Sequence, residues 1–281
     1  MNRWFSRVGW RHLVALLALA FSLFPILFVA SAALNPLGTL SSTSLVPAGA
    51  SLGNFTRLVA DTGFPRWFGN SVLIAGLAAV TSIFLSALAA YAFSRMRFRG
   101  RRVGLLALLL IQMFPQFLAI VAIFLIFSTI TDLWPAIGFN SPWGLVLLYL
   151  GGALGVNTWL MKGFFDTVPR ELDESAIVDG ATHAQVFFRI LVPLVAPILA
   201  VTGLLAFIGT INEFLIANVF LTDTSAKTLS VGMYGLVAGE RNNNFGIFCA
   251  GTLLTAVPTV VVFQFLQRYI VNGLTAGAVK G

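Results

Sequence analysis

Acidic side chains are scarce in this 281-residue chain, and half of them gather in one short stretch. Of its ten Asp and Glu residues, five lie within fourteen positions: Asp166, Glu171, Asp173, Glu174 and Asp179. Carboxylates placed so densely can serve as general acids and bases, as metal ligands, or as a charged surface that another protein recognises. The rest of the sequence decides among these three chemistries.

The residues that catalysis or metal binding would need are absent from the sequence. The two histidines, His12 and His183, are far apart and lack cysteine partners, which excludes a His-Glu-x-x-His zinc site, and we interpret each as a surface or interfacial residue. None of the three lysines lies in a Gly-x-x-x-x-Gly-Lys-Ser/Thr loop, so the chain does not cradle nucleotide phosphates by that device. We therefore predict no catalytic residue, no metal site and no cofactor bound by this chain.

The composition is that of a membrane protein. The chain is 58% hydrophobic and 10% charged, with a mean hydropathy of +0.92, whereas about 25% of residues are charged in soluble domains. A membrane-spanning helix needs about 20 apolar residues. Six apolar runs approach or exceed that length: 13–34, 68–93, 103–130, 143–160, 191–211 and 245–270. We expect an all-α integral membrane protein with about six transmembrane helices.

The net charge of +7 reflects membrane topology rather than a nucleic-acid partner, because the basic residues flank the apolar runs. Thirteen of the seventeen fall on one side: Arg3, Arg7, Arg11, Arg95, Arg97, Arg99, Arg101, Arg102, Lys162, Arg170, Arg189, Arg268 and Lys280. Four fall on the other: Arg57, Arg66, Lys227 and Arg241. The positive-inside rule makes the first side cytoplasmic, with both termini inside.

This topology predicts the organisation of the whole chain. A cytoplasmic N-terminus (1–12) and a first span (13–34) are followed by an outward loop (35–67). The core (68–270) holds five spans, a cytoplasmic loop (162–190) and a second outward loop (213–244), and a cytoplasmic tail (271–281) follows. Ala30-Ser31-Ala32 also fits a signal-peptidase site. We favour retention of the first span, because residues 13–29 are longer than a usual signal core.

The acidic stretch carries the signals of two short helices in the cytoplasmic loop. Pro169 suits a first helical position, and Glu171, Asp173 and Glu174 follow at the positive end of the helix dipole. Leu172, Ala176 and Ile177 form one apolar stripe. Gly180 can end the helix in a left-handed conformation, and Thr182-x-x-Gln185 is a capping box that starts a second, amphipathic helix. A solvated loop needs none of these signals, so we predict a docking helix for a soluble partner.

At this point the sequence resembles a known family. Glu174-Ser175-Ala176, three residues, Gly180, nine residues, Ile190, two residues and Pro193 is similar to the "EAA" signature of permease subunits of binding-protein-dependent ABC importers. That signature reads Glu-Ala-Ala, three residues, Gly, nine residues, Ile-x-Leu-Pro. Ser175 and Val192 depart from it while the spacing is kept. The resemblance implies the type I ABC importer permease fold and a place in the prokaryotic plasma (inner) membrane.

Further segments look like the MalG-type subunit of maltose/maltodextrin importers. They are Gln112-Met113-Phe114-Pro115, Tyr149-Leu150-Gly151-Gly152, Trp159-Leu160-Met161-Lys162-Gly163 and the tail from Val271 to Gly281. The resemblance implies a MalF-type permease partner, two copies of an ABC ATPase that binds ATP and Mg, and an extracytoplasmic sugar-binding protein. It also implies that the outward loop before the sixth span approaches this binding protein.

The resemblance assigns roles to particular residues. The ATPase-coupling residues are implied to be Glu174, Ser175, Ala176, Asp179, Gly180, Ile190 and Pro193. The tail residues implied to reach between the ATPases are Gly273, Leu274, Thr275, Ala276, Gly277 and Lys280. Asn212 and Glu213, at the outer end of the fifth span, are candidates for the translocation path, because ionisable groups at membrane depth often mark one.

Two alternatives remain at the level of sequence. The sugar could be trehalose or another oligosaccharide instead of a maltodextrin. The chain could also be a stand-alone secondary transporter or channel, a class that often shows inverted repeats or charged mid-membrane sites. Neither feature is found, so we favour the importer subunit.

The topology is directly testable. Cysteine introduced as Arg99→Cys or Glu174→Cys should react with a membrane-impermeant reagent only from the cytoplasmic side, because the basic residues hold both connections inside. Labelling of either position from the outside would contradict the topology.

Overall fold

The computed structural model describes residues 8–46, 49–239 and 243–278, and every regular element within these ranges is a helix. The predicted all-α fold is confirmed. Five helices are long and apolar enough to cross a membrane: residues 10–34, 64–95, 142–167, 183–211 and 245–270. The chain forms two compact units, residues 1–65 with 232–257 and residues 66–231 with 258–281.

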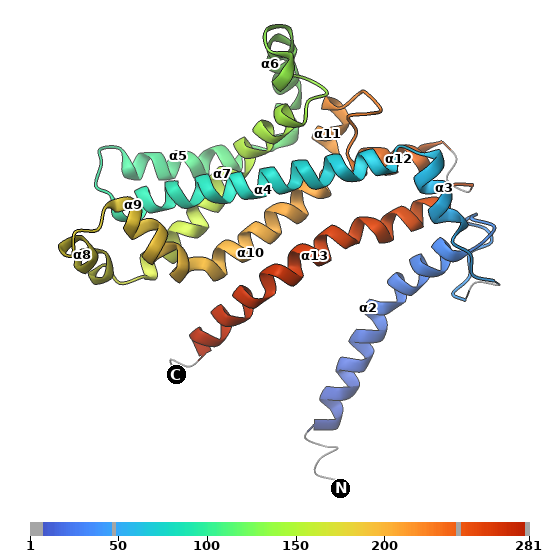
Figure 1. Ribbon diagram of the computed structural model, residues 1–281, viewed down its shortest axis with the longest axis horizontal. Helices are drawn as coiled ribbons and strands as arrows, with labels where there is room; N and C mark the ends of the chain where they lie inside the picture. The colour runs from blue at the N-terminus through green and yellow to red at the C-terminus, as the bar shows by residue number, and fades with distance from the viewer. Residues whose placement is uncertain (1–7, 47–48, 240–242, 279–281) are drawn as a thin grey trace. The chain divides into compact units, whose positions relative to one another are not determined.

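Most of the helices follow one another with short connections, whereas a long loop joins α2 to α3 (Figure 1). In chain order they are α2 (Trp10–Leu34), α3 (Gly53–Asp61), α4 (Phe64–Arg95), α5 (Arg101–Met113), η2 (Gln116–Ala119), α6 (Ile120–Leu133), η3 (Pro135–Ile137), α7 (Pro142–Thr167), α8 (Glu171–Val178), α9 (His183–Gln185), η4 (Val186–Leu191), α10 (Val192–Ile211), α11 (Leu215–Phe220), α12 (Leu229–Ala238) and α13 (Phe245–Ala278). The expected outward loops therefore contain α3 and, further on, α11 and α12.

The first unit is organised around one buried amide, Asn54 in α3. Its side chain is 1% exposed, and its Nδ2 donates to the carbonyls of Ala33 and Asn35, each at 2.9 Å. The Nη2 of Arg57 donates to its Oδ1 at 2.5 Å. Since buried polar groups cost free energy unless they are paired, this amide fixes the chain that leaves α2. The same loop bonds to α13, where the amide of Gly246 donates to the carbonyl of Gly38 at 2.8 Å.

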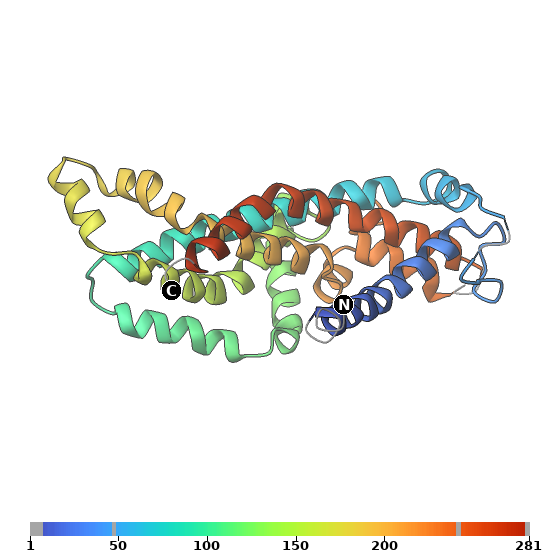
Figure 2. The ribbon, with the colours of Figure 1, turned by 90° about the horizontal axis from the view of Figure 1, so that it is seen from below.

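In the second unit α4 packs against α7 and α10 through small side chains. Ala75, Ala78, Ala79, Ala87 and Ala90 of α4 are all buried, and small residues let helices approach closely in a membrane, where little hydrophobic force drives them together. One buried cluster joins Ala87 and Ala90 to Met161 and Phe165 of α7 and to Leu191 and Val195. The short helix α8 lies at one end of these helices in both views (Figures 1 and 2).

The third expected span, residues 103–130, is divided in two. α5 ends at Met113, and α6 begins at Ile120 after the 3-10 turn η2. The break falls at Pro115, which has no amide hydrogen and disfavours the helical conformation of the residue before it. Phe114 is accordingly extended, with φ −76° and ψ 124°. The expectation of one continuous helix was wrong, because the run of apolar residues hides the effect of a single proline.

The expected separate amphipathic helix after Gly180 is instead the beginning of the fifth span. α9, the π-helical turn η4 and α10 form one continuous run from His183 to Ile211. Val186 and Phe187 are buried, and the Phe187 ring packs against Tyr91 with centroids 5.3 Å apart. The residues that follow the glycine turn are therefore part of the same helical run as α10.

Candidate functional sites

The acidic stretch forms α8, a two-turn helix held against the end of α4 by a buried ion pair. Its first turn contains Glu171, Asp173 and Glu174, as expected. Asp173 points inward, and its Oδ2 lies 2.6 Å from the Nε of Arg95, with the two side chains only 12% and 8% exposed. Sequence reasoning treated Asp173 as one of the surface acids and missed this partner.

Further polar contacts surround the ion pair. Ser94 Oγ donates to Asp166 Oδ1 at 2.6 Å, and Lys162 Nζ donates to the other oxygen of that carboxylate at 2.5 Å. Arg170 Nη2 donates to the Ser94 carbonyl at 3.1 Å, and Arg95 Nη2 donates to the Val168 carbonyl at 2.8 Å. Asp166 and Asp173 thus hold α4, α7 and α8 together, which explains two of the five clustered acids.

The pKa of the Asp173 carboxyl is set by its burial between α4 and α8. Burial raises the pKa of Asp173 above its ordinary value and outweighs the guanidinium groups of Arg95 and Arg170, which act in the opposite direction. The carboxylate therefore takes up a proton at a less acidic pH than an exposed aspartate would.

Much of the remaining surface of α8 is exposed and partly apolar. Leu172, Ile177 and Val178 are 42%, 46% and 86% exposed. The acids Glu171, Glu174 and Asp179 and the hydroxyl of Ser175 are exposed beside them. Ala176 packs instead against the core cluster of α4, α7 and α10, so the expected stripe of Leu172, Ala176 and Ile177 is divided between two surfaces. Exposed apolar side chains rimmed by charge mark a surface for another protein.

The end of α8 has the backbone geometry that the sequence predicts. Gly180 has φ +86°, its amide donates to the Ile177 carbonyl at 3.0 Å, and the amide of Ala181 donates to the Ala176 carbonyl at 2.9 Å. This is the Schellman motif, which places a left-handed residue after the helix. The capping box of Thr182 and Gln185 is also confirmed.

Pro169 and two residues of the motif, Ile190 and Pro193, lie around these two caps. Pro169 precedes α8, which begins at Glu171, so the prediction of Pro169 as the first helical residue was wrong by two positions. Ile190 is half-buried in η4, and Pro193 is exposed in the first turn of α10. The motif therefore covers α8, the glycine turn and the start of α10 as one continuous structure.

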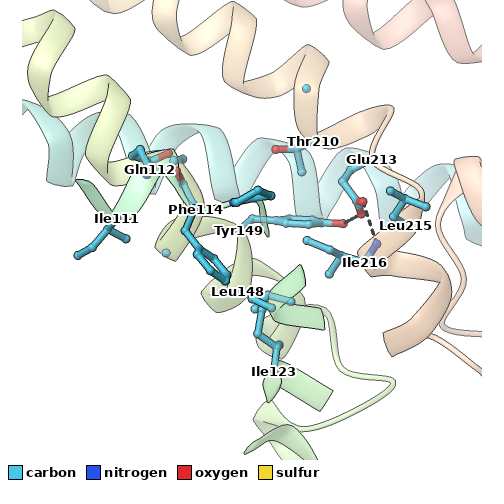
Figure 3. Close-up of a pocket in the computed structure, with 16 residues that line it drawn as sticks. Ile111, Gln112, Phe114, Ile123, Leu148, Tyr149, Thr210, Glu213, Leu215 and Ile216 are labelled. Atoms are coloured by element: carbon cyan, nitrogen blue, oxygen red, sulfur yellow. Dashed lines mark hydrogen bonds between the residues drawn. The ribbon is translucent and has the colours of Figure 1, made fainter. Parts of the chain in front are cut away.

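A second site is a cavity of about 820 Å³ bounded by α5, η2, α6, α7, α10 and α11 (Figure 3). Its wall includes Gln112 and Phe114 from the broken third span, Tyr149 and Gly152 from α7, and Thr210 near the end of α10. Glu213, which follows α10, also lines it. Of the two candidate path residues, Glu213 faces this cavity, whereas Asn212 is exposed, with its Nδ2 bonded to the Ile208 carbonyl.

Glu213 is fixed by three donors. Tyr149 donates its hydroxyl to Oε2 at 2.7 Å, the amide of Ala217 donates to the same oxygen at 3.0 Å, and the amide of Ile216 donates to Oε1 at 2.8 Å. The two amides belong to α11, so the carboxylate satisfies free donors at the start of that helix. Figure 3 shows the Tyr149 ring reaching across the cavity wall to this carboxylate.

The cavity residues Gln112 and Tyr149 were not predicted as site residues. Both belong to segments that carry the family resemblance, Gln112–Pro115 and Tyr149–Gly152, which is the signal that could have identified them. Gln112 Nε2 donates to the Gly152 carbonyl at 2.7 Å, and a Cβ on Gly155 would lie 2.6 Å from the Gln112 side chain. The Gly151-x-x-x-Gly155 segment therefore admits α5 close to α7.

The predicted tail residues Gly273, Leu274, Thr275, Ala276 and Gly277 lie in the last turns of α13, whereas Lys280 lies outside the described residues. Among the described residues no group of three His, Cys, Asp or Glu side chains could hold a metal ion.

Comparison with known proteins gives a consistent result. Residues 82–275 match the protein family described as binding-protein-dependent transport system inner membrane component. The chain is 39% identical to the maltose/maltodextrin transport system permease protein MalG of Escherichia coli (strain K12), over 98% of this chain and 97% of that protein. It is 38% identical to the galactooligosaccharides transport system permease protein GanQ of Bacillus subtilis (strain 168), over 96% of each.

The fold is shared with a solved structure as well. The chain superimposes with a TM-score of 0.77 on a chain of a bacterial ABC transporter involved in the import of the acidic polysaccharide alginate. The two are 24% identical, and the match covers 95% of this chain and 97% of the other.

The ion pair yields a matched pair of variants. Asp173→Asn should destabilise the protein by about 3 kcal/mol, because it leaves the buried Arg95 guanidinium without a counter-charge. Glu174→Gln, on the exposed side of the same helix, should change stability by less than about 0.5 kcal/mol. Thermal unfolding of the purified protein measures both, and equal effects would show that the ion pair does not hold α8.

Proposed function

Because this chain belongs to the family of binding-protein-dependent transport system inner membrane components, and is thus a permease subunit of an ABC sugar importer, we propose a role for each of its two sites. α8 docks into a cytoplasmic ATPase subunit, and the cavity forms part of the path of the sugar. The observation that carries the first role is the exposed acidic and apolar surface of α8, presented on a helix that an ion pair holds rigidly.

The proposed coupling uses a continuous connection. Motion of the ATPase would act on Leu172, Ile177 and Val178, and the rigid attachment of α8 to Arg95 would transmit it to α4. The second route runs through Gly180 and the capped start of α9 into α10, which leads to Glu213 in the cavity wall. The residues proposed to couple to the ATPase are Glu174, Ser175, Asp179 and Gly180 on the exposed side of the helix, Ala176 beneath them against the core cluster, and Ile190 and Pro193 at the entry to α10.

The proposed assembly follows from the same family membership. It contains a MalF-type permease partner, two copies of an ABC ATPase that binds ATP and Mg, and an extracytoplasmic sugar-binding protein. Both termini would lie in the cytoplasm, with the tail of α13 between the ATPases and residues 213–244 near the binding protein. We propose maltose/maltodextrin-type oligosaccharides as the substrate, which agrees with the maltose/maltodextrin transport system to which the relative MalG belongs.

Gly180 provides the test of the coupling role. Gly180→Val places a β-branched side chain at φ +86°, which costs on the order of 1–2 kcal/mol. The space around Gly180 is open, so the effect comes from the backbone alone. Gly180→Asn is the matched control, because asparagine tolerates the left-handed conformation.

The expected result separates docking from folding. The Gly180→Val subunit should insert and pair with its permease partner, but retain about tenfold less ATPase on purification and lose maltotriose uptake in proteoliposomes. The Gly180→Asn subunit should retain the ATPase on purification and should support maltotriose uptake. Full ATPase retention and uptake by Gly180→Val would show that α8 is not the coupling element, and uptake by the purified chain alone would favour a stand-alone transporter.

A further inference from the structure

The break in the third span opens one wall of the cavity beside Glu213. Phe114 is extended, Pro115 donates no backbone hydrogen bond, and the Phe114 side chain is 57% exposed. In a membrane, irregular backbone is tolerated only where it is buried in protein or lines a water-filled cavity. Because Phe114 and Pro115 line the cavity, the irregular backbone of the broken helix fits a cavity that holds water and polar ligands, although most of its wall is apolar.

The opposite wall presents unused hydrogen-bond acceptors. A carboxylate offers about four acceptor positions, and three donors point at Glu213, so one position on Oε1 is left. The Tyr149 oxygen, whose hydrogen goes to Glu213 at 2.7 Å, can still accept. A ligand that brings hydroxyl donors matches this wall.

The charge of the wall discriminates among such ligands. Of the sixteen residues that line the cavity, Glu213 is the only charged one. A carboxylate on a ligand would meet no cation in this wall and would be repelled by Glu213, and repulsion is strong where water is partly excluded. A neutral ligand needs no cation in the wall and is not repelled by Glu213.

From these observations we infer that the cavity is a sugar subsite contributed by this chain, selective for neutral over acidic oligosaccharides. The inference rests on the proposed function as an importer permease. The Phe114 ring packs against the C–H face of a pyranose, while Tyr149 and Glu213 accept hydrogen bonds from its hydroxyl edge. A volume of about 820 Å³ lies within the range of small-ligand sites.

The test uses the complete importer in proteoliposomes, with its partner permease, ATPase and binding protein. The probes are maltotriose and a maltotriose analogue in which one ring is oxidised to a uronate. The readouts are sugar translocated per ATP hydrolysed, and the uptake ratio of the two sugars relative to wild type, which cancels the preference of the binding protein. Phe24→Leu is the control, because Phe24 is equally exposed, at 56%, on α2.

Each variant has a defined expectation. Phe114→Leu and Tyr149→Phe should each lower the amount of maltotriose translocated per ATP hydrolysed about fivefold, because each removes one contact with the sugar. Sugar-stimulated ATP hydrolysis should continue in both variants. Glu213→Gln should raise the uptake of the uronate analogue relative to maltotriose about tenfold. Phe24→Leu should change neither quantity.

The failure of the inference differs from the failure of the proposed function. Wild-type values of both readouts in Phe114→Leu and Tyr149→Phe would overturn the subsite while leaving the importer intact. A wild-type complex that transports neither sugar would overturn the proposed function and the subsite with it. If Glu213→Gln fails to fold because one of the two oxygens that accept from α11 is replaced by an NH₂ group, Tyr149→Phe, which keeps both amide bonds to Glu213, decides whether the cavity binds sugar.

Discussion

The buried ion pair between Arg95 and Asp173 is the contact on which the α8 end of this permease depends. Few charges are available in so apolar a chain, and taking two of them out of water is unfavourable unless they are paired closely. The pair joins the last residue of α4 to the first turn of α8 at 2.6 Å. With it in place, a two-turn helix that could not be stable alone presents a fixed surface.

The same restriction on buried polar groups shapes the other end of the core. Glu213 satisfies the first amides of α11 and takes the hydroxyl of Tyr149 from α7. Pro115 interrupts the third span, and the irregular backbone beside it lines the cavity. The helical run that contains α10 begins at the capped turn beside α8 and ends beside the cavity that Glu213 lines. A single continuous helix joins the two sites.

Local signals were readable from the sequence, and long-range pairings were not. Gly180 and the Thr182–Gln185 box act within a few residues, so their backbone consequences could be predicted and are confirmed. The partner of Asp173 lies on another helix, and Tyr149 is 64 residues from Glu213, so only the folded chain shows these contacts. Pro115 was visible, but the apolar run around it favoured an unbroken span.

The central claim, that α8 seats in the ATPase, is tested most directly by site-specific crosslinking. Val178→Cys places a thiol at a position that is 86% exposed on α8, while the natural Cys249 is 2% exposed and stays out of reach. In the assembled importer a short thiol-to-amine crosslinker should join this chain to the ATPase subunit. Leu37→Cys, at a position 70% exposed in the first outward loop, should give no such product. Absence of the ATPase adduct from Val178→Cys, or its equal appearance from Leu37→Cys, would contradict the account.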